Sequence, residues 1–411
     1  MAVAKPPAGW RRSLPAALLA AYFVAMPIQF QWPDAYRQIA PADLLLAAYL
    51  VIRLPQLRHA PAAWTMWHFA LLPLLAFGMI VAAVRTGEIT AYALLQKGLG
   101  LLILFALFAC LVDFARDWDR LQWIMRTFVG AVLLHASVAL MAQVMVYLGG
   151  PVIPLINEPH SLERISGLVL DPNAFGGLVA LAFVLHHLTA GTPSALLPGA
   201  WAWIGYLVLP TTLLLTFSRS AWLGLAIGLF TVALLRPGHG GRALLTIVVP
   251  TAIVAPLVLA VIPNSVDLAT RAGTIASRVV LDENALTGFL RNSLTGMGLG
   301  VYVEKYGIVV HNTTLWFLSD LGGIGLAVFL GLLATVTVRL VMTARIAPPD
   351  RRPLALALLC GHALMFGLSL GIEAFYQRHW WIVLAGAGAA YALATSPDPA
   401  EQKSDERVST R

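Results

Sequence analysis

The chain has 411 residues, of which 59% are hydrophobic and only 11% are charged. Soluble domains carry about 25% charged residues, so this composition excludes an ordinary water-soluble protein. The net charge of +7 is not a nucleic-acid footprint, because most of the basic residues fall in short segments between apolar runs, where they set membrane topology. We therefore expect membrane lipids around the chain and no nucleic-acid partner.

Apolar runs that could cross a bilayer follow one another along most of the chain. A spanning helix needs about 20 apolar residues, and the run at 41–54 is the weakest candidate. The first run follows basic residues, as a signal peptide does, but it lacks a clear cleavage site and is expected to be retained. The predicted spans cover residues 14–31, 41–54, 65–84, 90–112, 122–148, 174–190, 199–217, 220–236, 243–262, 313–338, 353–371 and 379–396.

The distribution of basic residues supports twelve spans and sets their orientation. With the N-terminus inside, the inside segments hold most of the lysines and arginines, which is the bias of cytoplasmic loops. Without the weak second span, the basic residues would no longer concentrate on one side of the membrane. We therefore predict an all-α polytopic membrane protein with both termini cytoplasmic. The inside basic residues are Lys5, Arg11, Arg12, Arg53, Arg58, Arg116, Arg120, Arg236, Arg242, Arg345, Arg351, Arg352, Lys403, Arg407 and Arg411.

Two segments on the predicted outer side are longer than a turn, 149–173 and 263–310. The second, between spans nine and ten, is the largest hydrophilic piece of the chain. Its first half is predicted to be helical, and a short second helix is expected to begin after Asp282 and to end at the glycines 296–300.

No internal repeat and no separate soluble domain is evident in the sequence. Residues 1–396 are therefore predicted to form a single transmembrane domain. The tail, 397–411, is charged and contains prolines, a composition that cannot bury a core, so we expect it to be disordered.

Arginines collect on the predicted outer side, although the topology rule tends to deplete that side of basic residues. Any one of them is more often solvated or paired with an acid than functional. As a set they favour an anionic ligand, because guanidinium groups match phosphate oxygens and stay charged at any relevant pH. A diphosphate would suit several of these residues, which are Arg164, Arg219, Arg271, Arg278, Arg291 and Arg378.

Arg219 and His311 are the strongest candidates. Arg219 lies in "TFSRSAWLG" between two apolar stretches, with little loop around it, and an arginine in that position is costly unless an anion compensates it. His311 begins "HNTTLWFLSDLGGIG" at the mouth of the tenth span, where a neutral imidazole could take a proton from a hydroxyl. Asn312 could orient this ring or cap the following helix. No outer cluster has metal-ligand spacing, so we expect neither a metal nor another cofactor.

Four motifs resemble, in their order and gaps, those of the O-antigen ligase and O-antigen polymerase superfamily. They are "RISGLVLDPNAFGG" from Arg164, "TFSRSAWLG" from Thr216, "GMGLG" from Gly296 and "HNTTLWFLSDLGGIG" from His311. The resemblance covers roughly residues 160 to 330, and the number of spans extends it over the whole chain.

The resemblance implies a bacterial inner-membrane glycosyltransferase of the GT-C-like, metal-independent type. In the ligase branch, the enzyme transfers an O-antigen chain from undecaprenyl diphosphate to lipid A–core at the periplasmic face. The arginine of the serine-arginine-serine junction, arginines of the large loop and the histidine before the tenth span correspond to Arg219, to Arg278 with Arg271 or Arg291, and to His311. The tryptophan and proline that many relatives carry after the loop arginine are missing here, so either Arg278 or Arg291 could be the equivalent residue.

Several alternatives stay open at this point. An O-antigen polymerase uses the same donor, and a protein O-oligosaccharyltransferase is a third member of the superfamily; the single compact loop favours the ligase. A transporter or lipid flippase would show inverted repeats and ionisable residues at the membrane midplane. Here the spans are largely free of charge, and we expect Lys97, inside the fourth span, to face a cavity or to snorkel. This pattern favours chemistry at one interface over transport.

Overall fold

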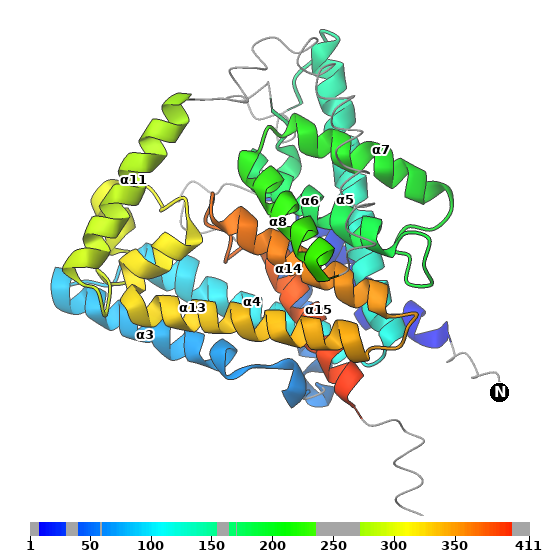
Figure 1. The fold of residues 1–411 in the computed structure, drawn as a ribbon, viewed down its shortest axis with the longest axis horizontal. Helices are drawn as coiled ribbons and strands as arrows, with labels where there is room; N and C mark the ends of the chain where they lie inside the picture. Colours follow the sequence, from blue (N-terminus) through cyan, green and yellow to red (C-terminus); the bar gives the residue numbers. More distant parts are fainter. Residues whose placement is uncertain are drawn as a thin grey trace, which may run out of the picture.

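The computed structural model describes residues 8–29, 40–57, 60–153, 164–169, 171–235 and 272–396. Within these ranges the chain is helical and forms no strand, and Figure 1 shows the helices gathered into one bundle. The α-helices are α1 (Leu14–Ala25), α2 (Pro41–Arg53), α3 (Met66–Thr86), α4 (Gly100–Phe114), α5 (Trp118–Tyr147), α6 (Pro172–Thr189), α7 (Ala200–Leu215), α8 (Arg219–Leu235), α11 (Ala272–Arg291), α12 (Val301–Tyr306), α13 (Thr313–Ile346), α14 (Arg352–Ser369) and α15 (Arg378–Thr395). A π-helix, η4 (Tyr92–Leu99), leads into α4, and short 3₁₀ turns lie at Ala8–Arg12, Leu54–Gln56, Pro61–Ala63 and Gly167–Val169.

Every predicted span that falls within the described residues contains a helix. Six helical segments in this part of the chain are long and apolar enough to cross a membrane: α3, η4 with α4, α5, α6, α13 and α14. Helices α1, α7 and α8 are apolar but shorter. The protein is thus a helical membrane protein by length and composition. The count of twelve and the GT-C-like arrangement stay predictions, because the ninth predicted span, 243–262, and the tail, 397–411, lie outside the described residues.

Glycines bring α8 and α14 into close contact. A Cβ atom at Gly224 would lie 2.5 Å from the carbonyl oxygen of Leu364, and one at Gly228 would lie 2.7 Å from that of Cys360. Glycines four residues apart share one face of a helix and let two backbones touch, as in many pairs of membrane helices. Because α14 also packs on α6, α13 and α15, these helices are held together around it.

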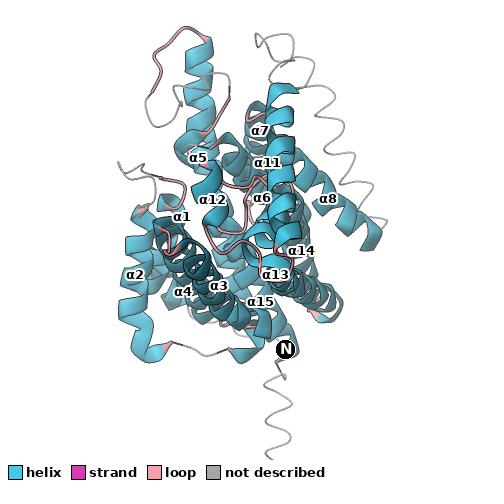
Figure 2. Cartoon of the chain, turned by 90° about the vertical axis from the view of Figure 1, so that its left-hand side faces the viewer, coloured by secondary structure: helices cyan, strands magenta, loops and turns pink. Residues whose placement is uncertain are grey.

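Helix α11 lies across one end of the bundle, beside the end of α3 and the start of α13, and we call this the α11 end (Figures 1 and 2). The predicted helix start after Asp282 is wrong, because α11 runs without interruption from Ala272 to Arg291. Ala285 and Gly288 are buried, Gly288 against Met297, and α11 packs against α13, so α11 stays packed on both sides of the predicted break. The acidic residues of this stretch therefore lie in the middle of a helix.

The glycine-rich segment 296–300 docks into a break in α13. At the break Gly322 has a positive φ of 68°, which glycine adopts without the steric cost that a side chain brings. The N–H of Gly298 donates to the carbonyl of Asp320 at 3.1 Å, and the N–H of Gly300 donates to the buried carboxylate of Asp320 at 2.9 Å. The segment thereby fastens the end of α11 to α13.

Candidate functional site

The loop Leu370–Gln377, between α14 and α15, gathers contacts from two other elements at the α11 end. Asn312 donates through Nδ2 to the carbonyl of the first loop residue at 3.1 Å. Arg278 donates through Nη1 to the carbonyl of Gly371 at 3.0 Å, and the hydroxyl of Thr313 donates to the carbonyl of the third loop residue at 3.2 Å. Three successive carbonyls thus hold α11 and the start of α13. We call these eight residues the α14–α15 loop.

Arg219 is the first residue of α8, and a tight turn precedes it. Phe217, two positions earlier, has a φ of 48°, a left-handed conformation that is strained for a bulky side chain. The hydroxyl of Ser218 accepts a hydrogen bond from the N–H of Ala221 at 3.3 Å and so caps the helix. Ser218 and Ser220 are both buried, whereas Arg219 is half-buried. The turn therefore leaves Arg219 less buried than the serine on either side of it.

Arg278 is close enough to Arg219 for the two guanidinium groups to repel each other. Burial lowers the pKa of Arg278 from its ordinary value, and the positive charge of Arg219 lowers it further, against an opposite effect from Asp171 and Asp282. Two like charges in a half-buried site repel each other and so raise the free energy of the folded protein. An anion that contacts both guanidinium groups would relieve this repulsion.

Asp282 lies close to both Arg278 and His311. The carbonyl of Val309 lies 3.0 Å from Nδ1 of His311, and the tautomer that donates this hydrogen bond leaves Nε2 with a free lone pair. Burial raises the pKa of Asp282, while the nearby His311 and Arg278 lower it. One carboxylate oxygen of Asp282 is buried and has no hydrogen-bond partner among the described residues. Asp282 was not among the predicted site residues, because the acidic stretch looked like the start of a helix.

Arg164 and Arg378 are held by protein groups. The side chain of Arg164 is buried; its Nε donates to the carbonyl of Thr216 at 2.8 Å and its Nη2 donates to Asn173 at 3.0 Å. Arg164 thus ties the start of α6 to the turn that carries Arg219. Arg378 donates through Nη2 to both carboxylate oxygens of Asp43, at 2.8 and 2.7 Å. Of the three arginines predicted to bind substrate, these two therefore have structural partners.

The remaining predicted site residues are Asn312, Arg291 and Arg271. Asn312 caps α13, since its side-chain oxygen accepts from the N–H of Leu315 at 3.2 Å. Arg291 is exposed at the last position of α11, which is about 20 Å from Arg278 along the helix axis. The structure therefore brings Arg278 and Arg219 together and leaves Arg291 apart. Arg271 lies outside the described residues.

Lys97 and Glu373 form an ion pair that the sequence did not predict. Nζ of Lys97 donates to Oε2 of Glu373 at 3.0 Å, and the side chain of Lys97 is only 3% exposed. Three aromatic rings surround the ammonium group, with centroids at 4.0 Å (Tyr376), 4.4 Å (Trp316) and 5.2 Å (Tyr92). Lys97 is thus buried and paired and does not snorkel; it anchors the α14–α15 loop. The cost of a lysine in a span signals that it needs a partner, but not which one.

At the α11 end, then, two arginines, an imidazole and a carboxylate lie around the start of α8 and the start of α13. Helices α6, α8, α13 and α15 all begin at this end, so their N-terminal partial positive charges add to those of the arginines. Such a site can hold an anion and accept a proton. Comparisons of the chain with protein-family models and with curated proteins return no match.

Proposed function

We propose that the protein is an O-antigen ligase, a glycosyltransferase that moves a polysaccharide from undecaprenyl diphosphate to lipid A–core at the periplasmic face of the bacterial inner membrane. The juxtaposition of Arg219 and Arg278 beside His311 carries this proposal. The order of the sequence motifs and the membrane helices support it.

The arginines would stabilise the leaving group. As the bond between the anomeric carbon and the diphosphate oxygen breaks, negative charge grows on the diphosphate. Arg219 and Arg278 already lie in a half-buried site, where a fixed positive charge aimed at a developing negative charge is worth about 10²–10³ in rate. Because these charges are permanent, we propose that transfer needs no metal ion.

His311 would act as the general base. Its Nε2 would take the proton from the acceptor hydroxyl as the hydroxyl oxygen bonds to the anomeric carbon, and this displacement would invert that carbon. General-base catalysis contributes about 10²–10⁴-fold. Asp282, whose pKa is raised by burial, would stabilise the imidazolium ion that forms.

The test is a transfer assay with the protein in lipid nanodiscs, a glycan on undecaprenyl diphosphate as donor, and lipid A–core as acceptor. We expect transfer in the presence of EDTA, a loss of about 10²-fold or more in Arg219→Ala and Arg278→Ala, and a comparable loss in His311→Ala. Lys305→Ala, on the exposed part of α12 at the same end of the bundle, is the matched control and should keep the native rate.

The acceptor decides between the related activities. Transfer to a second carrier-linked glycan, and not to lipid A–core, would mean a polymerase, and transfer to a protein would mean a protein O-oligosaccharyltransferase. A native rate in His311→Ala would remove the base assignment. If the native protein transfers the glycan to none of the three acceptors, the proposal is wrong.

A further inference from the structure

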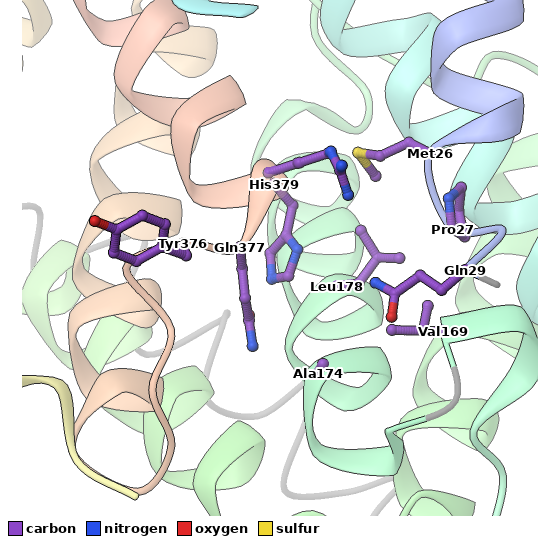
Figure 3. Close-up of a pocket in the computed structure, with 10 residues that line it drawn as sticks. Met26, Pro27, Gln29, Val169, Ala174, Leu178, Tyr376, Gln377 and His379 are labelled. Atoms are coloured by element: carbon purple, nitrogen blue, oxygen red, sulfur yellow. The ribbon is translucent and has the colours of Figure 1, made fainter. Parts of the chain in front are cut away.

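The two ends of α1 differ in how the positive charge beside them is balanced. The end of α1 borders a cavity of about 160 Å³, which α6 and α15 also line (Figure 3). The arginine of that cavity, Arg378, donates to both carboxylate oxygens of Asp43, so its charge is neutralised. The start of α1 follows Arg11 and Arg12, and within the described residues neither has an acidic partner. Figure 1 shows this N-terminal segment, in blue, on the opposite side of the bundle from α11.

The segment before α1 packs against the end of α4 and the start of α5 through Trp10. Its indole lies edge-on to Phe114, at 5.6 Å between ring centroids, and to Trp123, at 5.8 Å. Two guanidinium groups lie over the same indole, with Cζ of Arg11 at 5.4 Å and Cζ of Arg120 at 5.3 Å from its centroid. These are cation–π distances. One tryptophan thus brings together two arginines that belong to different elements.

A third arginine, Arg126, lies less than two turns after Arg120 on α5. It is half-buried, and Arg11 lies close enough for the two positive charges to repel each other. Its Nη2 donates to the carbonyl of Ala195 at 2.7 Å, but within the described ranges no carboxylate pairs with it. We call Trp10, Arg11, Arg120 and Arg126 the Trp10 cluster.

The carboxylates of the neighbouring segment do not balance the charge of the Trp10 cluster, because arginines already engage them. Three of these four arginines lie outside the cluster. The pairs are Asp117 with Arg120, Asp113 with Arg53 and Arg116, and Asp119 with Arg351. The cluster therefore keeps an excess of positive charge, and guanidinium groups match the oxygens of a phosphate in geometry and in charge.

The surroundings of the cluster favour a lipid phosphate over a soluble one. One face of α1 exposes apolar side chains at intervals of three or four residues, the spacing of a single helix face, and it begins three residues after Arg11. Tryptophan is enriched where lipid headgroups meet acyl chains. The sequence places this end of the bundle on the cytoplasmic side, where anionic lipids attract basic segments. The exposed residues of this face are Leu14, Ala17, Ala21 and Val24.

We propose that the Trp10 cluster binds the phosphate of an anionic phospholipid, whose acyl chains lie along the exposed face of α1. The headgroup would contact Arg11 and Arg120 beside the indole and would relieve the repulsion between Arg11 and Arg126. This site lies apart from the α11 end, so it does not depend on the proposed function.

Native mass spectrometry of the protein released from detergent micelles counts the lipids that stay bound. The probe is palmitoyl-oleoyl phosphatidylglycerol, with palmitoyl-oleoyl phosphatidylcholine as the lipid without net charge and ammonium phosphate as the soluble anion. Arg11→Gln should weaken the first phosphatidylglycerol adduct at least about tenfold, as the loss of one hydrogen bond to a charged group would. Arg345→Gln is the matched control, because it removes an exposed guanidinium group from the last turn of α13, and it should bind like the native protein.

Arg120→Gln is the second variant, because it removes the other guanidinium group over the indole. A first adduct that both Arg11→Gln and Arg120→Gln leave unchanged would overturn the inference. Equal losses in Arg11→Gln and Arg345→Gln would also overturn it, since they would show a general attraction to basic residues and not a site. Equal binding of phosphatidylcholine would exclude the phosphate charge as the cause, and displacement of phosphatidylglycerol by ammonium phosphate would assign the cluster to a soluble anion instead of a lipid.

Discussion

Replacing Lys97 by methionine keeps most of the side-chain volume and removes the ammonium group. Glu373 would then lose the only ion-pair partner it has among the described residues, in a site where its own side chain is 14% exposed. The three rings of Tyr92, Trp316 and Tyr376 would lose the cation they surround. The substitution therefore leaves a carboxylate without compensation in a nearly dry environment.

The expected loss of stability is large. Removing one partner of a buried ion pair costs about 3–5 kcal/mol. We count the loss of the cation–π contacts within this figure. Glu373→Gln removes the other charge, and the double variant Lys97→Met with Glu373→Gln should recover a good part of the loss. We expect a coupling energy of about 2 kcal/mol, within the range for contacting residues and above the average of about 0.6 kcal/mol for hydrogen bonds between membrane helices.

The assay is reversible unfolding by SDS in mixed micelles for the native protein, the two single variants and the double variant, with glycan transfer measured in parallel. Lys305→Met is the control, because Lys305 also lies over a tyrosine ring, at 5.1 Å from that of Tyr306, but on an exposed helix. It should change the free energy of unfolding by less than about 0.5 kcal/mol. A coupling energy between Lys97 and Glu373 close to zero would refute the reasoning.

Three further predictions concern the α11 end. A Cβ atom at Gly371 would overlap the Ser220 hydroxyl and lie 2.9 Å from Ser220 Cβ. Gly371→Ala should therefore lower the transfer rate, and adding Ser220→Gly should restore it. If the double variant is not rescued, the clash is not the cause. Arg291→Ala should keep the transfer rate within about threefold while Arg278→Ala loses about 10²-fold or more, and equal losses would contradict the separation along α11. Because the pKa of Asp282 is raised in the folded protein, its charge destabilises the fold as pH rises from the ordinary aspartate range through the raised pKa. In a pH series of unfolding, Asp282→Asn should therefore gain stability relative to the native protein over that window. An advantage of the variant that grows toward lower pH would contradict this sign.

The spans were predictable because their signal is local. Apolar runs of bilayer length and the distribution of basic residues require only neighbouring positions, and a helix occupies each predicted span within the described ranges. An arginine between two apolar stretches needs an anion to compensate it, so the sequence also predicts that Arg219 faces an anionic ligand, and this stays a prediction. These features depend on composition rather than on the register of one helix against another.

Long-range partners could not be predicted in this way. Lys97 and Glu373 are 276 positions apart, and no local pattern links them. Arg378 resembled the functional arginines until the structure placed it on Asp43 at the start of α2. The same limit applies to Asp282, whose role depends on the face that α11 turns toward Arg278 and His311. Each case depends on which helix lies beside which, and a single sequence does not encode that in a form that can be read locally.

The three carbonyls of the α14–α15 loop have a consequence for how the protein would respond to mutagenesis and to evolution. Carbonyl oxygens are common to all residue types, so the exposed first loop position, Leu370, could change identity while still accepting from Asn312, whereas the side chain of the third, Ile372, is buried in the core. An alanine scan would score Leu370 as a mere spacer. Only a change to the main chain, such as replacement of an amide by an ester through semisynthesis, would reveal the contribution of this position. What holds the neighbouring element there is the backbone geometry of the loop and not the identity of the side chain.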